Sequence, residues 1–192
     1  MDPLLGIPVG LALSTAAGLR VFVPLLITSL AARSGYLALT PGMSWIASDS
    51  ALVAFVTAAL VEVCAYYVPW LDNVADAIAT PAAITAGIIE MAAVTPDLPP
   101  LLRWTVAIIA GGGVAGFAQL GTTLLRFKSS TLTAGMGNPI LATGELVGAL
   151  GMAVLALLAP LLATVFVVIL LVFLSRRMMR RRGKRRADLP AR

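Results

Sequence analysis

The sequence predicts an all-α membrane protein with about six transmembrane helices, or with five and a re-entrant half-helix. Three observations lead to this fold class: 59% of the 192 residues are hydrophobic, only 12% are charged, and the apolar residues form long runs. A soluble domain carries about 25% charged residues, and one core of this size cannot hide so much apolar surface. We therefore expect lipid to surround much of the chain.

Proline, glycine and polar residues divide the apolar runs. We expect spans at residues 4–32, 46–68, 72–94, 101–127, 139–158 and 161–175. The first run would make a helix of about 43 Å, whereas the hydrocarbon core of a bilayer is about 30 Å thick. It must therefore tilt or break, and Gly18 and Pro24 on either side of Arg20 favour a break. The last apolar stretch is also too long for one crossing, and Pro160 predicts a turn within it.

Positive charge gathers at the C-terminus. Nine of the fourteen Lys and Arg residues lie in residues 176–192, directly after the last apolar run. Because cytoplasmic flanks are enriched in Lys and Arg, we expect one transmembrane domain, 1–175, and a basic cytoplasmic tail, 176–192. Six spans then place both termini in the cytoplasm. Membrane lipids, with anionic headgroups at the tail, are the expected partners in preference to nucleic acid, and a homo-oligomer is a further expectation.

The residue inventory excludes several kinds of site. The chain has no His, and Cys64 is its single Cys. Disulfides within the chain, His-based acid–base catalysis and thiolate or imidazole metal sites are therefore excluded. We expect no cofactor, and the sequence leans away from an enzyme. The start MDPLLG lacks a basic region, so the first apolar run is expected to be retained.

A faint internal repeat links the two halves of the chain. Each half has a long apolar run with glycines, then a polar loop, then a span with one Glu: Glu62 in TAALVEV and Glu145 in LATGELV. With three spans each, the halves would form a 3+3 inverted repeat with broken helices, as in many transporters. The glycines at 111–113 lie in an apolar span without a following GK[ST], so they predict close helix packing and not a nucleotide loop.

Three ionisable residues lie within the apolar spans: Arg20, Glu62 and Glu145. Burying a charge at membrane depth costs about 2.5–3.5 kcal/mol even on the lenient insertion scale. We therefore expect Arg20 and Glu62 to neutralise one another as a pair on neighbouring helices. Glu145 is expected in the bundle interior or, equally, near the interface at its helix start. The pair would coordinate an anion or a proton, or it would be a structural ion pair. Glu90, near the outer end of its span, is expected to meet water.

Two aspartates in LDNVAD suggest a different chemistry. Asp72 and Asp76 are four residues apart, which places both carboxylates on one helical face. Acidic pairs of this kind hold Mg²⁺ on diphosphate substrates in membrane prenyl-transfer enzymes, although those enzymes use two such motifs and this chain has one. The structural interpretation is that Asp72 caps the third helix and Asp76 lies in its first turn.

Four stretches carry a family resemblance: AAGLRVFVPLL, the Glu62 span leading into PWLDNVADAI, the glycine-rich fourth span, and GNPILATGEL. On these stretches the chain resembles the bacterial membrane proteins grouped as domain of unknown function 4126. The resemblance implies a compact multi-span protein of the bacterial inner membrane and no defined activity. Where the family often has a His and a Lys ahead of the basic residue matching Arg126, this chain has Gln119 and Thr122. The secondary polar cluster comprises Asp72, Asp76, Gln119, Arg126 and Lys128.

The leading hypothesis is a small-solute or ion transporter, or a channel-like protein. Its buried polar pathway would be built from Arg20, Glu62 and Glu145. One alternative is a Mg-dependent enzyme or binder of phosphate-bearing lipids at the cytoplasmic face, with Asp72 and Asp76 as the metal ligands. The other is a non-catalytic membrane scaffold in which every buried charge is structural.

Overall fold

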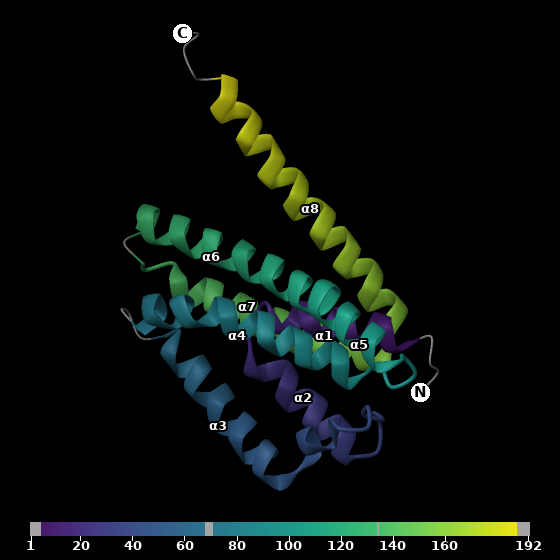
Figure 1. Ribbon diagram of the computed structural model, residues 1–192. Coiled ribbons are helices and arrows are strands. Elements are labelled where there is room, and N and C mark those ends of the chain that lie inside the picture. Colours follow the sequence, from purple (N-terminus) through teal and green to yellow (C-terminus); the bar gives the residue numbers. More distant parts are fainter. Residues whose placement is uncertain (1–4, 68–70, 134, 188–192) are drawn as a thin grey trace.

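The computed structural model describes the backbone of residues 5–67, 71–133 and 135–187, and their side chains except at 71–77, 174–175 and 177–187. These residues form helices and no strands, which confirms the predicted all-α class (Figure 1). The elements are α1 (Gly6–Ala17), α2 (Phe22–Arg33), η2 (Ser44–Ala47), α3 (Asp49–Ala65), α4 (Leu71–Ala93), α5 (Pro100–Val106), η3 (Ala107–Gly112), α6 (Gly113–Thr133), α7 (Asn138–Leu158) and α8 (Pro160–Ala187).

Most helices begin where the sequence places start signals. The Ser48 hydroxyl accepts a hydrogen bond from the Ala51 N–H at 3.2 Å and so caps α3. Proline occupies the first turn of α5 and α7 and the first position of α8, where its missing N–H costs nothing. α5, η3 and α6 follow one another without a break as one helix, Pro100–Thr133. α7 ends at Leu158 and α8 begins at Pro160, which confirms the turn that Pro160 predicts between the last two helices.

The first apolar run breaks at the predicted place. α1 ends at Ala17 and α2 begins at Phe22, with a turn between them. Gly18 is the first residue of this turn and lies against the backbone carbonyl of Ala115 in α6. A side chain at position 18 would collide with that carbonyl. The glycine thus lets the end of α1 pack directly on α6.

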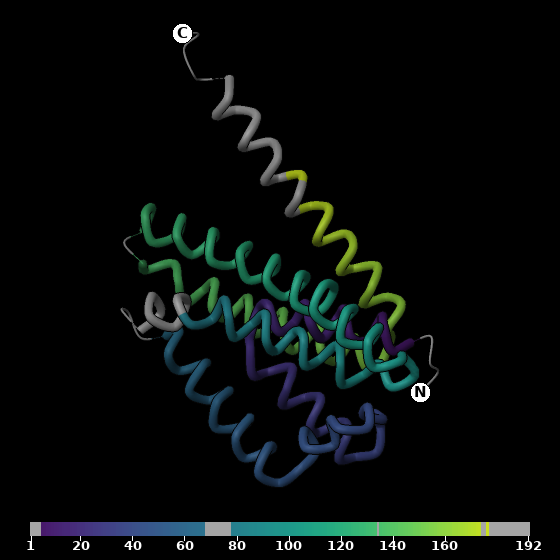
Figure 2. Tube along the Cα trace, in the orientation of Figure 1, coloured from purple at the N-terminus to yellow at the C-terminus, as the bar shows by residue number. Residues whose placement is uncertain are grey.

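After the turn the chain reverses direction. A Cβ atom at Gly6, at the start of α1, would lie 2.5 Å from the carbonyl oxygen of Val94, at the end of α4. The loop after α2 returns to the same place, where the Thr40 N–H donates to the carbonyl of Ala93 at 2.8 Å. α1 and α2 therefore form a helical hairpin that enters and leaves at one face of the bundle (Figure 2). The first apolar run therefore forms two antiparallel helices, and the prediction of one span over residues 4–32 is not confirmed.

Two faces can now be defined. The base face carries the start of α1, the loop after α2 and the end of α4; the far face carries the end of α3 and the turn between α6 and α7. The first half of the chain contains the hairpin and two long helices, whereas the second half contains three long helices. The halves differ in their elements, so the predicted 3+3 repeat is not confirmed.

α1 lies at the centre of the bundle, packed against α4, α7 and α8. Small residues allow this close packing: Ala12 and Ala16 of α1 are fully buried, as is Ala92 of α4. Gly87 of α4 meets Gly111 of η3 so closely that a Cβ atom at position 87 would lie 2.7 Å from the Gly111 carbonyl oxygen. Close packing at the triple glycine is thus found, although Gly113 itself faces open space.

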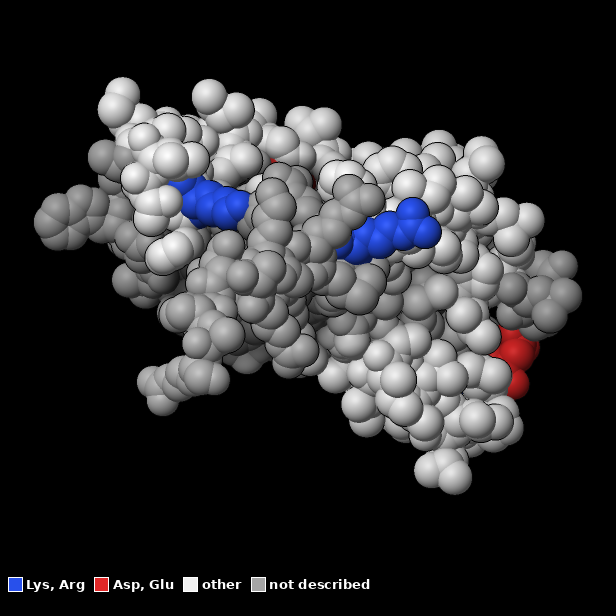
Figure 3. Space-filling view, turned by 90° about the horizontal axis from the view of Figure 1, so that it is seen from above, with Lys and Arg blue, Asp and Glu red and all other residues white. Residues whose placement is uncertain are grey.

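The outside of the bundle is strongly apolar. Leu101, Ile109, Leu132 and Ile140 are among many large apolar side chains that are more than half exposed. Figure 3 shows one face of the molecule, on which only isolated charged side chains appear among the described residues. Two helices, Pro100–Thr133 and Asn138–Leu158, are long and apolar enough to cross a membrane, and the other apolar helical stretches with described side chains are shorter. These features suggest membrane association.

The glycine contact between α4 and η3 predicts a matched pair of variants. Gly87→Ala should lower the free energy of unfolding by about 1–3 kcal/mol, because the added methyl group collides with backbone that cannot move alone. Gly113→Ala adds the same methyl group in open space and should leave stability equal or slightly higher. Thermal unfolding of the purified proteins measures both, and equal midpoints for the two variants would contradict the packing described.

Candidate functional site

The tip of the hairpin is held by a carboxylate from another helix. Glu62 of α3 accepts the backbone N–H of Val21 through Oε1 at 2.7 Å and that of Phe22 through Oε2 at 3.0 Å. These N–H groups open α2, which has no capping side chain of its own. A carboxylate at a helix N-terminus satisfies unpaired donors and the positive end of the helix dipole together. Glu62 is therefore the N-terminal cap of α2.

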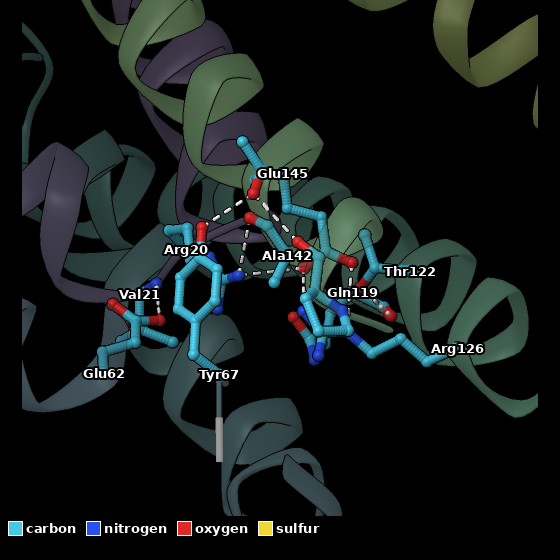
Figure 4. A network of polar contacts seen from close by, with 11 residues as sticks. Arg20, Val21, Glu62, Tyr67, Gln119, Thr122, Arg126, Ala142 and Glu145 are labelled. Carbon is cyan, nitrogen blue, oxygen red and sulfur yellow. Dashed lines mark hydrogen bonds and ion pairs between the residues drawn. The ribbon is translucent and has the colours of Figure 1, made fainter. Parts of the chain in front are cut away.

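Beside this cap, one carboxylate serves two guanidinium groups (Figure 4). Arg20 Nη2 lies 3.3 Å from Glu145 Oε2 and donates to the carbonyl of Ala142 at 2.9 Å. Arg126 Nε donates to Glu145 Oε1 at 3.1 Å, and Arg126 Nη2 contacts Oε2. The Arg20 side chain is 1% exposed and that of Glu145 10%. The hairpin tip, α6 and α7 thus meet at a single shared carboxylate.

An aromatic ring completes the cluster. The guanidinium carbons of Arg20 and Arg126 each lie 4.0 Å from the centre of the buried Tyr66 ring. Cations are attracted to the negative face of an aromatic ring, and the attraction is stronger away from water. Tyr66 therefore helps to hold two like charges close together. One residue further on, the Tyr67 hydroxyl lies 2.7 Å from Thr143 Oγ1 and ties the end of α3 to α7.

The cluster, defined as Arg20, Glu62, Tyr66, Arg126 and Glu145, lies inside the bundle and closer to the far face. Glu145 is seven residues into α7, which corresponds to a depth of about 10 Å from that end. The hairpin reaches the same level from the base face. The interior position expected for Glu145 is therefore the one that the structure shows, and its helix-start alternative is not.

The pairing inside the cluster differs from the prediction. Arg20 forms its ion pair with Glu145, whereas Glu62 binds the backbone amides next to Arg20. The structure shows no direct Arg20–Glu62 ion pair among the described residues, although the two side chains interact electrostatically within the cluster. The physical reason is the reversal of the chain, which exposes two N–H groups at the start of α2 and gives Glu62 a partner that an unbroken helix would not offer.

The secondary polar residues divide into those near the cluster and those outside the described side chains. Gln119 and Thr122 are buried on α6, two turns and one turn before Arg126, and Figure 4 shows both beside it. Lys128 follows on the same helix and is half-buried. The side chains of Asp72 and Asp76 fall outside the described residues. Among the described residues, no three acidic or cysteine side chains gather into a possible metal site.

Glu90 forms a second buried polar contact, near the base face. Its side chain is fully buried, and Oε2 accepts a hydrogen bond from the Thr28 hydroxyl of α2 at 2.8 Å. The expectation that Glu90 meets water is wrong, because the returning arm of the hairpin covers it. This contact fastens α2 to α4, as the charged cluster fastens the tip.

Sequence reasoning missed Tyr66 as a member of the cluster. A signal was present, because Tyr66 follows Glu62 by four residues and therefore shares its helical face. The carbonyl of Ala142, three residues before Glu145, was missed as well. No sequence signal marks a backbone carbonyl as the partner of a distant arginine.

Comparison with known proteins settles the family. The model of the family described as a domain of unknown function, number 4126, matches residues 7–180. The chain belongs to this family. The match covers the hairpin, the charged cluster and most of α8, so the resemblance expected from the sequence is confirmed. No curated protein and no solved structure matches the chain. The family has no stated activity, so function must be argued from the site.

The shared carboxylate predicts a strong stability effect. Glu145→Gln should lower the free energy of unfolding by about 3–5 kcal/mol, because two buried guanidinium groups lose their shared counter-charge. The control is Asp49→Asn, which removes an ion pair of 2.6 Å between Arg33 and the highly exposed Asp49 and should change little. Chemical unfolding measures both, and the double variant Arg126→Gln/Glu145→Gln should recover part of the loss. A Glu145→Gln protein as stable as Asp49→Asn would contradict the assignment.

Proposed function

We propose that this protein lies in the bacterial inner membrane with five crossings and a re-entrant hairpin. The crossings are α3, α4, the continuous α5–α6 helix, α7 and α8, and the hairpin is α1–α2. The far-face end of α6 carries Arg126 and Lys128, and the basic tail begins within the C-terminal part of α8, whereas Arg33 and Arg103 lie towards the base face. The positive-inside rule then makes the far face cytoplasmic. The N-terminus falls on the opposite side from the tail, in contrast to the sequence expectation of two cytoplasmic termini.

Within this topology we propose transport of a small solute or ion. The observation that carries the proposal is the hairpin tip, where two helices end inside the bundle at a charged cluster. Helix breaks at membrane depth are tolerated only where protein surrounds them or where they line a cavity. Transporters place such breaks at their substrate site, with the N-terminal N–H groups of a half-helix directed at an anionic group. The N–H groups of Val21 and Phe22 have this position, and Glu62 occupies them.

The donors of the cluster favour a solute with an anionic group. Arg20 Nε and Nη1 are buried and have no hydrogen-bond partner among the described residues. Buried N–H donors of a guanidinium group are suited to carboxylate or phosphate oxygens. In the arrangement described, carboxylates of the protein fill the two anion-binding positions: Glu145 at Arg20 and Glu62 at the start of α2. An entering anion would have to displace one of them, and this exchange is the proposed transport step.

The two alternative functions place different requirements on the protein. The lipid-enzyme alternative requires Asp72 and Asp76 to hold Mg²⁺ beside Arg126, which is bound to Glu145. The scaffold alternative requires only that the charges satisfy one another, and the shared carboxylate supports it. Transport alone requires solute to cross a membrane that contains this protein.

Topology gives the first test. On a Cys64→Ser background, Tyr36→Cys at the base face should react with an impermeant maleimide in intact cells. Met136→Cys at the far face should react only after the inner membrane is permeabilised, because the far face is cytoplasmic. An epitope tag at the N-terminus should be accessible with Tyr36→Cys, and a C-terminal tag should not. An N-terminal tag protected in intact spheroplasts would refute the re-entrant hairpin.

Transport is tested in liposomes that contain the purified protein. We expect efflux of chloride, phosphate or formate above that of protein-free vesicles, since the cluster offers guanidinium donors to small anions. Arg20→Gln should reduce the efflux at least tenfold, and Arg20→Lys should keep part of it. Arg33→Gln, at the base face, is the control and should transport normally. Absence of flux for all three anions, or equal flux in Arg20→Gln and Arg33→Gln vesicles, would favour the scaffold.

A further inference from the structure

A cavity of about 540 Å³ lies between the start of α2, α3 and α4. Its walls are rich in small residues: Ala54, Ala58 and Ala65 on one face of α3, and Ala79 and Ala82 on α4. Small faces on neighbouring helices normally allow close packing. Here the ribbons of α3 and α4 diverge from one another (Figure 1), and the alanines line the cavity between the two helices.

The polar groups of the cavity walls already have partners. The Thr57 hydroxyl donates to the carbonyl of Val53 at 2.8 Å within α3. The Glu62 carboxylate is occupied by the N–H groups of α2. Tyr66 is engaged with Arg20 and Arg126 through its ring. The space therefore offers a guest contact with hydrocarbon surface and little else, which disfavours water and polar solutes.

The cavity opens sideways, towards the exposed apolar surface. Val61 and Ile78 line the cavity, and both side chains are largely exposed. In the proposed topology this surface faces the hydrocarbon core of the bilayer. The long direction of the cavity follows α3 from Ala54 to Ala65, about 16 Å, and ends near the cytoplasmic face. Acyl chains of the cytoplasmic leaflet run in the same direction.

The shape of the cavity suits a lipid chain. A space that is apolar, about 16 Å long and open along its side can accept a flexible hydrocarbon chain that enters from the bilayer. We propose that one acyl chain of a phospholipid from the cytoplasmic leaflet occupies this cavity. The inference rests on the proposed membrane topology and not on transport.

The acyl chain contacts the hairpin as well as the two long helices. Val21 and Phe22, whose N–H groups bind Glu62, form part of the cavity wall. A bound chain therefore packs against the start of α2 and beside Glu62, which caps it. The lipid is thus a structural partner of the hairpin tip and adjoins the charged cluster at Glu62 and Tyr66.

Native mass spectrometry tests the site on full-length protein extracted in mild detergent and titrated with dioleoyl phosphatidylglycerol or dioleoyl phosphatidylethanolamine. The wild type should retain one phospholipid of either headgroup, because the cavity recognises the chain. Ala58→Trp fills the cavity and should reduce retention at least fivefold. Leu60→Trp adds the same side chain at an exposed α3 position outside the cavity and should retain the lipid.

Ala54→Leu, at an exposed position on the cavity wall, provides a second filling variant should Ala58→Trp fold poorly, and circular dichroism checks the folding of each.

Equal retention in the filling variants and in Leu60→Trp would overturn the proposal, as would a wild type without retained lipid. Retention of phosphatidylglycerol alone would assign the lipid to the basic tail. A dimer that Ala58→Trp dissociates would show a second copy of the chain in the cavity. Retained lipid without anion flux would reject transport and leave the lipid site intact.

Discussion

The arrangement of the bundle depends on one carboxylate that is shared by two buried guanidinium groups. Arg20 comes from the hairpin tip, Arg126 from α6 and Glu145 from α7, so their ion pairs join three parts of the chain that are far apart in sequence. Neither arginine can move away without leaving a buried charge uncompensated, which costs several kcal/mol. Tyr66 lets the two like charges approach, because each guanidinium group also faces its ring.

A second constraint comes from the backbone of the hairpin tip. A chain that turns inside an apolar bundle leaves helix-end N–H groups without partners, and water is not available to satisfy them. Glu62 supplies both oxygens to the start of α2, so α3 and the hairpin depend on one another. The Thr28–Glu90 hydrogen bond fastens the same helix near its other end. The hairpin is thus fixed at its tip and near its base, in a position that only α3, α4, α6 and α7 together define.

The two proposals assign different chemistry to the two sides of this tip. On one side lie the charged groups, in which carboxylates of the protein occupy the positions suited to an anion. On the other side lies an alanine-lined space whose wall includes Glu62 and Tyr66 of the cluster, and its length of about 16 Å suits an acyl chain. Val21 and Phe22 belong to both sides, since their N–H groups bind Glu62 and their side chains line the cavity. A change of lipid at the cavity would therefore act on the same turn that a solute must pass.

The sequence by itself determined the helical class, the family, the helix limits at Pro160 and the break near Arg20, because these follow from apolar run length and from the local geometry of proline and glycine. It also selected Arg20, Glu62 and Glu145, since a charge in an apolar run needs a partner. Only the tertiary structure decided which partners meet. The direction of the chain after Gly18 is set by packing against Ala115, a contact almost 100 residues away in sequence. Because of that reversal, the first apolar run forms a hairpin and Glu90 is buried. Arg20 therefore pairs with Glu145, and Glu62 caps α2.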